Sequence, residues 1–166
     1  CLEDRRFFEH HGVDLAGVIR ALIANLQSGY IVQGFSTVTM QVAGNYLLDR
    51  REKTYTRKLK EVFLAFNLER ELSKQEILEL YLNKIFLGQR AYGFAAAASV
   101  YFNKTLNDLS LAEIATLAGV PKAPSARNPI TNPDGARVRR DYVLKRMRDL
   151  QHITEDDYLA ATNALV

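Results

Sequence analysis

Apolar residues recur every three or four positions behind helix-capping residues, and this pattern repeats along most of the chain. Ser73–Glu76 and Ser110–Glu113 both fit the capping box, in which a serine and a glutamate three residues later bond each other's backbone N–H groups. Asp14, Asp134 and Thr154 are predicted to cap further helices. No segment shows the alternation of apolar and polar residues that is typical of half-buried strands. The sequence therefore predicts an all-α fold.

The composition fits one compact domain over residues 1–166, because 48% of the residues are apolar. The net charge is only +3, since 19 acidic residues accompany 22 basic ones, which argues against nucleic-acid binding. Cys1 has no second cysteine to pair with and is interpreted as an inert thiol. No apolar run approaches the ~20 residues that span a bilayer. Because the chain begins inside a motif and ends without a stop signal, we expect a fragment of a longer, membrane-anchored protein.

A strong helix is predicted between Arg57 and Glu71, and it is apolar on both faces. The face predicted to be core carries Leu59, Val62, Phe63 and Phe66. The opposite face begins with Arg57, Lys60 and Glu61 and continues with Leu64 and Leu68. Because this second face turns apolar, we expect Glu61 to be partly buried.

Two stretches are expected to be irregular. Gly29–Leu48 carries no charge, and it is either a buried hairpin or helix or a mobile, membrane-facing flap. In the second case the interfacial residues would include Tyr30, Ile31, Val32 and Phe35. All four prolines lie between Pro121 and Pro133, which predicts one ordered, winding connection.

The N-terminal segment packs carboxylates, histidines and aromatic residues into Glu3-Asp4-Arg5-Arg6-Phe7-Phe8-Glu9-His10-His11-Gly12. This density of functional groups indicates a reaction site, and the helix predicted after Asp14 would support it from behind. That helix has its apolar positions at Leu15, Val18, Ile19, Leu22 and Leu26. The adjacent histidines diverge and have no third ligand at metal spacing, so His10 is interpreted as a structural hydrogen-bonding residue.

Four further segments follow in order: Gly34-Phe35-Ser36-Thr37-Val38-Thr39-Met40-Gln41 with Asn45; Arg57-Lys58-Leu59-Lys60-Glu61; Ile77–Asn83 with Gly88; and Leu111-Ala112-Glu113 with Leu117-Ala118 and the Pro-Ser-Asn-Pro elements of residues 124–129. Together with the N-terminal segment they resemble the five signatures of the peptidoglycan glycosyltransferase family. This family comprises the transglycosylase domains of class A penicillin-binding proteins and the monofunctional glycosyltransferases. The resemblance covers most of the chain and extends to Asn132-Pro133 and Arg139-Arg140.

The resemblance implies a lysozyme-like helical domain with a mobile, partly membrane-facing small lobe. It also implies polymerisation of lipid II into β-1,4-linked glycan strands with inversion and release of undecaprenyl pyrophosphate. An acceptor alcohol is a poor nucleophile at neutral pH, so a carboxylate must take its proton, and Glu3 is the candidate general base. Glu61 matches the family's second acidic residue, which could orient cations or hold a divalent ion (Mg or Mn); no cofactor is otherwise required.

Cations near the leaving pyrophosphate would lower the barrier, and Lys53, Arg57, Lys58 and Lys60 supply them. The predicted substrate-binding residues are Asp4, Phe7, His10, Ser36, Thr37, Thr39, Gln41, Asn45, Lys53, Arg57, Lys58, Lys60 and Asn83. The expected partners are lipid II, the nascent glycan strand, the membrane surface and a transpeptidase domain in the full-length protein. The expected location is the extracytoplasmic (periplasmic) face of the bacterial inner membrane.

The second signature departs from the family at Met40 and Gly44, where members commonly have a glutamine and a cation. Arg50 could compensate for the missing cation, and Gly44→Lys is predicted to tighten binding of a diphosphate lipid. The departure keeps open a non-catalytic binder of lipid-linked precursors. A glycan-cleaving, lysozyme-like enzyme is a second alternative, but it needs no basic cluster beside a diphosphate.

Overall fold

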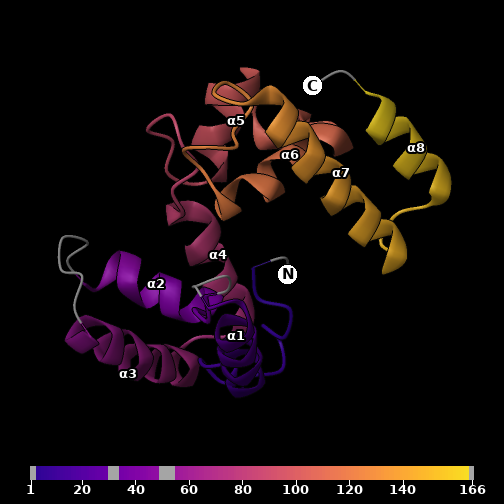
Figure 1. Ribbon diagram of the computed structural model, residues 1–166. Helices are drawn as coiled ribbons and strands as arrows, with labels where there is room; N and C mark the ends of the chain where they lie inside the picture. The colour runs from indigo at the N-terminus through magenta and orange to yellow at the C-terminus, as the bar shows by residue number, and fades with distance from the viewer. Residues whose placement is uncertain (1–2, 30–33, 49–54, 165–166) are drawn as a thin grey trace. The chain divides into compact units, whose positions relative to one another are not determined.

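The structure is a computed structural model that describes residues 3–29, 34–48 and 55–164. These residues form eight α-helices and two short 3₁₀ helices, and their only β-type pairing is an isolated bridge between Phe86 and Tyr92 (Figure 1). The predicted all-α class is confirmed. The chain groups into two compact units, residues 3–84 and residues 85–164, and the partition into one domain stays a prediction.

The first unit contains α1 (Leu15–Ser28), α2 (Val38–Tyr46), α3 (Tyr55–Glu71) and α4 (Lys74–Lys84). Helix α2 is central, because it packs against both α3 and α4 (Figure 1). Its side chains Val38, Met40, Val42 and Ala43 are almost completely buried. Within the uncharged Gly29–Leu48 stretch, Val38–Tyr46 is therefore a largely buried helix. Phe35 is partly exposed just before it, whereas Tyr30, Ile31 and Val32 lie outside the described residues.

Helix α3 buries the face opposite to the one that was predicted to be core. Leu59 and Phe63, which were expected in the core, are 71% and 66% exposed. Glu61 and Ala65 are buried instead, so the predicted burial of Glu61 is confirmed and the predicted core face is wrong. The reason is close approach: a Cβ added at Gly12 would lie 3.1 Å from the backbone of Ala65, and one at Gly44 would lie 2.9 Å from Glu61 Oε1. The buried face of α3 is therefore selected by the small residues at these contacts, Gly12, Gly44 and Ala65, and not by the size of its apolar side chains.

Helix α1 likewise leaves its apolar face exposed. Leu15 and Leu26 are 72% and 81% exposed, Ile19 and Leu22 are also exposed, and the buried residue of the helix is Ala21. This apolar face therefore does not pack inward, and support of the reaction site by the helix stays a prediction. Asp14 occupies the N-cap position, but its carboxylate pairs with Arg6 at 3.3 Å and does not accept a helix N–H.

The second unit contains α5 (Phe94–Phe102), the 3₁₀ helix Leu106–Asp108, α6 (Leu111–Gly119), the 3₁₀ helix Val120–Lys122, α7 (Pro133–Asp149) and α8 (Glu155–Asn163). The capping box at Ser110–Glu113 is complete, and Thr154 caps α8 with Asp157 in the same way. Helix α7 is capped by Asn132 and not by Asp134, because Pro133 takes the first helical position.

The proline-rich connection is ordered, as predicted. The buried side chain of Asn128 donates to the Pro124 carbonyl oxygen at 2.8 Å, and its own oxygen accepts from the Thr131 N–H at 2.9 Å. Beyond this connection, the buried guanidinium of Arg140 donates to the carbonyl oxygens of Thr162 and Ala164 and thereby ties α7 to the end of α8.

Candidate active site

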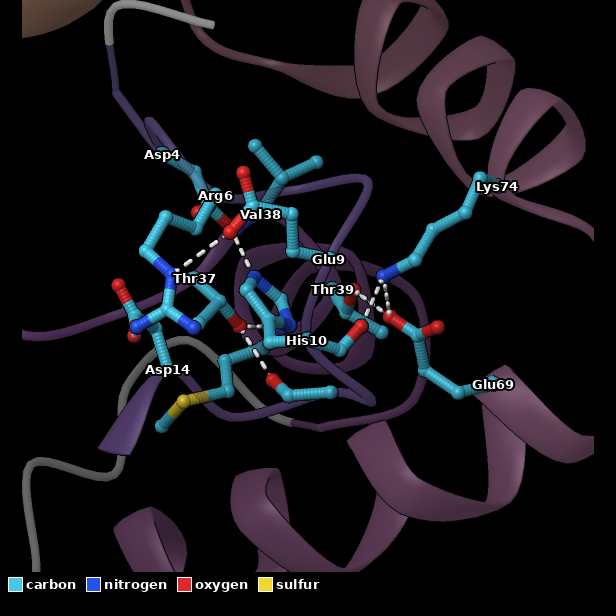
Figure 2. Close-up of polar contacts among 12 residues, drawn as sticks. Asp4, Arg6, Glu9, His10, Asp14, Thr37, Val38, Thr39, Glu69 and Lys74 are labelled. Atoms are coloured by element: carbon cyan, nitrogen blue, oxygen red, sulfur yellow. Dashed lines mark hydrogen bonds and ion pairs between the residues drawn. The ribbon is translucent and has the colours of Figure 1, made fainter. Parts of the chain in front are cut away.

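The N-terminal loop, residues 3–14, is fixed to the start of α2 by buried polar contacts (Figure 2). Asp4 Oδ2 lies 2.8 Å from His10 Nε2 and accepts the Val38 N–H at 3.1 Å. Thr37 Oγ1 donates to the Gly12 carbonyl oxygen at 2.6 Å and accepts the Met40 N–H, so one side chain both holds the loop and caps α2. The predicted structural role of His10 is consistent with this geometry.

Glu3 is half-buried in this loop, in the same unit as α4. Burial, and after it the negative charge of the Glu3 carboxylate, raises the pKa of the Tyr81 hydroxyl far above its ordinary value. Glu3 therefore acts electrostatically on α4. Tyr81 is 4% exposed, and its hydroxyl has no hydrogen-bond partner in the described part of the chain.

A cluster of charges joins α3 to the segment before α2. Glu61 is buried between Arg57, at 2.7 Å from Nη1, and Lys58, at 2.8 Å from Nζ. Lys58 also donates to Ser36 Oγ at 2.6 Å, and its ammonium lies 5.4 Å from the Phe35 ring centroid. The Arg57 and Lys58 side chains keep 21% and 31% of their surface exposed, whereas the Glu61 carboxylate beneath them is buried. The cluster therefore presents positive charge to solvent.

Gly44 is part of this arrangement. Its carbonyl oxygen accepts a long hydrogen bond of 3.4 Å from Arg57 Nη2, and a side chain there would meet Glu61 Oε1 and the Arg57 guanidinium. The lack of a side chain at Gly44 therefore makes room for the Arg57–Glu61 pair against α2.

Comparison with known proteins agrees with this architecture. A family model described as Transglycosylase matches residues 1–148. The chain belongs to the transglycosylase family. It is thus a peptidoglycan glycosyltransferase domain, as its five motifs predicted.

Transglycosylase relatives cover nearly the whole chain. A Cupriavidus necator protein that carries a provisional transglycosylase name is 58% identical over 158 residues, which are 95% of this chain and 68% of that protein. Penicillin-binding protein 1A of Neisseria gonorrhoeae is 57% identical over 92% of this chain, but the match spans only 19% of that protein. The crystal structure of penicillin-binding protein 1A from Haemophilus influenzae covers 78% of this chain and 16% of its own, with 39% identity and a TM-score of 0.55.

The predicted site residues of this transglycosylase domain form two clusters and a set of separate positions. The structure brings Ser36, Arg57, Lys58 and Glu61 together in one cluster and Asp4, His10 and Thr37 in another. Phe7 and Thr39 are buried, Gln41 and Asn45 are half-buried on α2, and Lys60 and Asn83 are exposed. Lys53 and Arg50 lie outside the described residues. Because Asp4, Phe7, His10, Thr37 and Thr39 contact protein atoms from buried positions, their contact with substrate stays a prediction.

Sequence reasoning missed Glu69 and Lys74, which form a partly buried ion pair of 2.7 Å at the corner between α3 and α4. Lys74 lies within the first capping box, where the only recognised signal was the Ser73–Glu76 pair. Nothing in its spacing identified the partner, because the contact depends on how α3 and α4 meet.

A divalent ion at Glu61 stays a prediction, and in this structure both carboxylate oxygens are already paired. Each Glu61 oxygen accepts from a cationic side chain, and ions such as Mg²⁺ require several oxygen ligands. Elsewhere in the described ranges, no group of three or more His, Cys, Asp or Glu residues is arranged to hold a metal. Among the same residues, no helix has the length and apolar character to cross a membrane.

Proposed function

We propose that this transglycosylase domain polymerises lipid II into β-1,4-linked glycan strands, with inversion at the donor carbon and release of undecaprenyl pyrophosphate. The observation that carries the proposal is the cluster of Arg57 and Lys58 on the buried Glu61, in the same unit as Glu3. A helix end that served only solubility would have no need to bury a carboxylate beneath its cations.

In the proposed reaction, Glu3 accepts the proton of the acceptor sugar's 4-hydroxyl as that oxygen attacks the anomeric carbon of the lipid-linked donor. The bond from this carbon to the pyrophosphate oxygen breaks on the opposite face, and the pair of electrons leaves with the pyrophosphate. Arg57 and Lys58 stabilise the charge that develops there. Glu61 and Ser36 hold the two cations in place, so little reorganisation is required when the charge appears.

The partners follow from the substrate. A donor whose tail stays in a bilayer requires an enzyme at the membrane surface, and the exposed apolar residues of α1 and α3 would favour such contact. We propose a location on the periplasmic face of the inner membrane. Because the named penicillin-binding proteins are far longer than this chain, a transpeptidase domain in the full-length protein is part of the same proposal.

The test is incubation of the protein with lipid II, followed by separation of the products on a gel. Polymer is the expected product, whereas cleavage of preformed glycan, or neither product, would contradict the proposal. Glu3→Gln should reduce polymerisation by about 10²- to 10⁴-fold and leave the circular dichroism spectrum unchanged, because it removes the proton acceptor and preserves shape. Glu9→Gln is the matched control, since Glu9 is an exposed carboxylate of the same loop that pairs with Arg6. Near-normal turnover in Glu3→Gln would defeat the assignment of the base.

A further inference from the structure

Lys74 is the first residue of α4, and its side chain is only 17% exposed because its ammonium group contacts three other residues. Its Nζ donates to the His10 carbonyl oxygen at 2.6 Å and to Glu69 Oε1 at 2.7 Å, as Figure 2 shows. The same nitrogen lies 4.6 Å from the centroid of the buried Phe7 ring, which is cation–π distance. Two of these three partners, Phe7 and His10, belong to the N-terminal loop.

Glu69 extends the connection to α2. Its Oε1 accepts from Lys74 and also from Thr39 Oγ1 at 2.6 Å, and Thr39 is completely buried. The Glu69 carboxylate keeps only 6% of its surface exposed. One ion pair therefore joins the N-terminal loop, which carries Glu3, to α2, to α4 and to α3, which carries Arg57, Lys58 and Glu61.

The loop is held from two sides at a single residue. The His10 ring is fixed by Asp4, whose carboxylate also accepts the Val38 N–H, and the His10 carbonyl oxygen is fixed by Lys74. Glu3 is the immediate neighbour of Asp4 in sequence. A displacement of the His10 backbone is thus transmitted through the Asp4–His10 contact to the segment that carries Glu3.

We propose that Lys74 and Glu69 are positioning residues for the reaction, which hold the N-terminal loop and hence Glu3 in register with α2 and α3. This inference rests on the proposed function. Burying two charges is costly unless each is fully paired, and a buried pair is weak evidence for stability alone. The pair contacts the loop backbone and the helices of the site. At such a site, a misplacement of about 1 Å can lower the rate on the order of 10²-fold.

The first experiment compares Lys74→Met with Lys104→Met. Lys104 pairs with Glu113 at 2.8 Å in the second unit, so both variants remove a lysine from an ion pair with a glutamate of low exposure. Lys74→Met should lower kcat for lipid II polymerisation by about 10- to 100-fold with KM within about twofold of wild type. Lys104→Met should leave both constants unchanged, and Lys74→Arg, which keeps a charged donor, should restore most of kcat.

Hydrogen exchange supplies a readout that does not depend on turnover. The amides of Glu9 and His10 bond the Arg6 carbonyl oxygen within the loop, and their exchange should accelerate in Lys74→Met and remain normal in Lys104→Met. If Lys74→Met fails to fold, the double variant Lys74→Met/Glu69→Gln, which leaves no uncompensated charge, takes its place. Normal kcat, or unchanged exchange in the loop, would overturn the inference. If the wild type makes no polymer, the proposed function fails, and the exchange result still decides whether the pair holds the loop.

Discussion

Glu61→Gln is the perturbation that tests the charge cluster most directly. The variant keeps the size of the side chain but removes the negative charge that faces Arg57 at 2.7 Å and Lys58 at 2.8 Å. The new amide group would point an N–H donor toward one of two cations, which offer donors only. The helix should persist, while the contact between α3 and α2 becomes electrostatically unfavourable.

The magnitude follows from burial. Breaking a fully buried ion pair by removing one partner costs about 3–5 kcal/mol, because the remaining charge is left without compensation. Here the remaining charges can partly rehydrate, since the Arg57 and Lys58 side chains are 21% and 31% exposed. We therefore expect a loss of about 2–3 kcal/mol in the free energy of unfolding, below the fully buried value and above the ~1 kcal/mol of a surface pair.

Urea unfolding followed by circular dichroism measures this loss. Glu71→Gln is the matched control, because it makes the same substitution at an exposed position of α3 and should change stability by less than about 0.5 kcal/mol. A double-mutant cycle with Arg57→Gln should show a coupling energy of about 1 kcal/mol or more. A Glu61→Gln loss no larger than that of the control would refute the interpretation of Glu61 as the buried counter-charge.

Three further outcomes are expected. Gly44→Lys should tighten binding of a diphosphate lipid by about 2- to 5-fold relative to Gly44→Ala. The alanine variant is the control, because it places the same Cβ 2.9 Å from Glu61 Oε1 but adds no charge. Equal dissociation constants for the two variants would contradict this prediction. Tyr81→Phe should change stability at pH 7 by less than about 1 kcal/mol, because the buried hydroxyl has no partner among the described residues. Since the pKa of Tyr81 is raised in the folded protein, wild type should lose stability above pH 10, the ordinary value, and the variant should lose less in a urea titration. Burial alone would raise the pKa of Glu113, but hydrogen bonds from Lys104 and the capping box outweigh burial and lower this pKa below its ordinary value of 4.5. The stability that Glu113 contributes is therefore present above pH 4.5 and is lost on acidification. Glu113→Gln should reduce the loss of stability between neutral and acidic pH.

Local signals in the sequence were sufficient for the helices with a recognised capping box and for the family. The capping boxes at Ser73 and Ser110 and the cap at Thr154 appear where they were predicted, because a cap involves only residues three positions apart. The N-terminal motif and Arg57–Glu61 identified the transglycosylase family, since these motifs are read directly from residue order. The burial of Glu61 was also foreseen from the apolar continuation of its face.

Only the tertiary structure decided which helix faces are buried and which polar groups meet. Periodicity showed that α3 is apolar on both sides, but the close approach at Ala65 selected the face that carries Glu61 and left Phe63 exposed. The Glu69–Lys74 pair depends on how α3 and α4 meet and on the N-terminal loop, whose His10 carbonyl oxygen accepts from Lys74. Pairings between residues far apart in sequence are set by the packing of whole elements, so no local pattern in the chain encodes them.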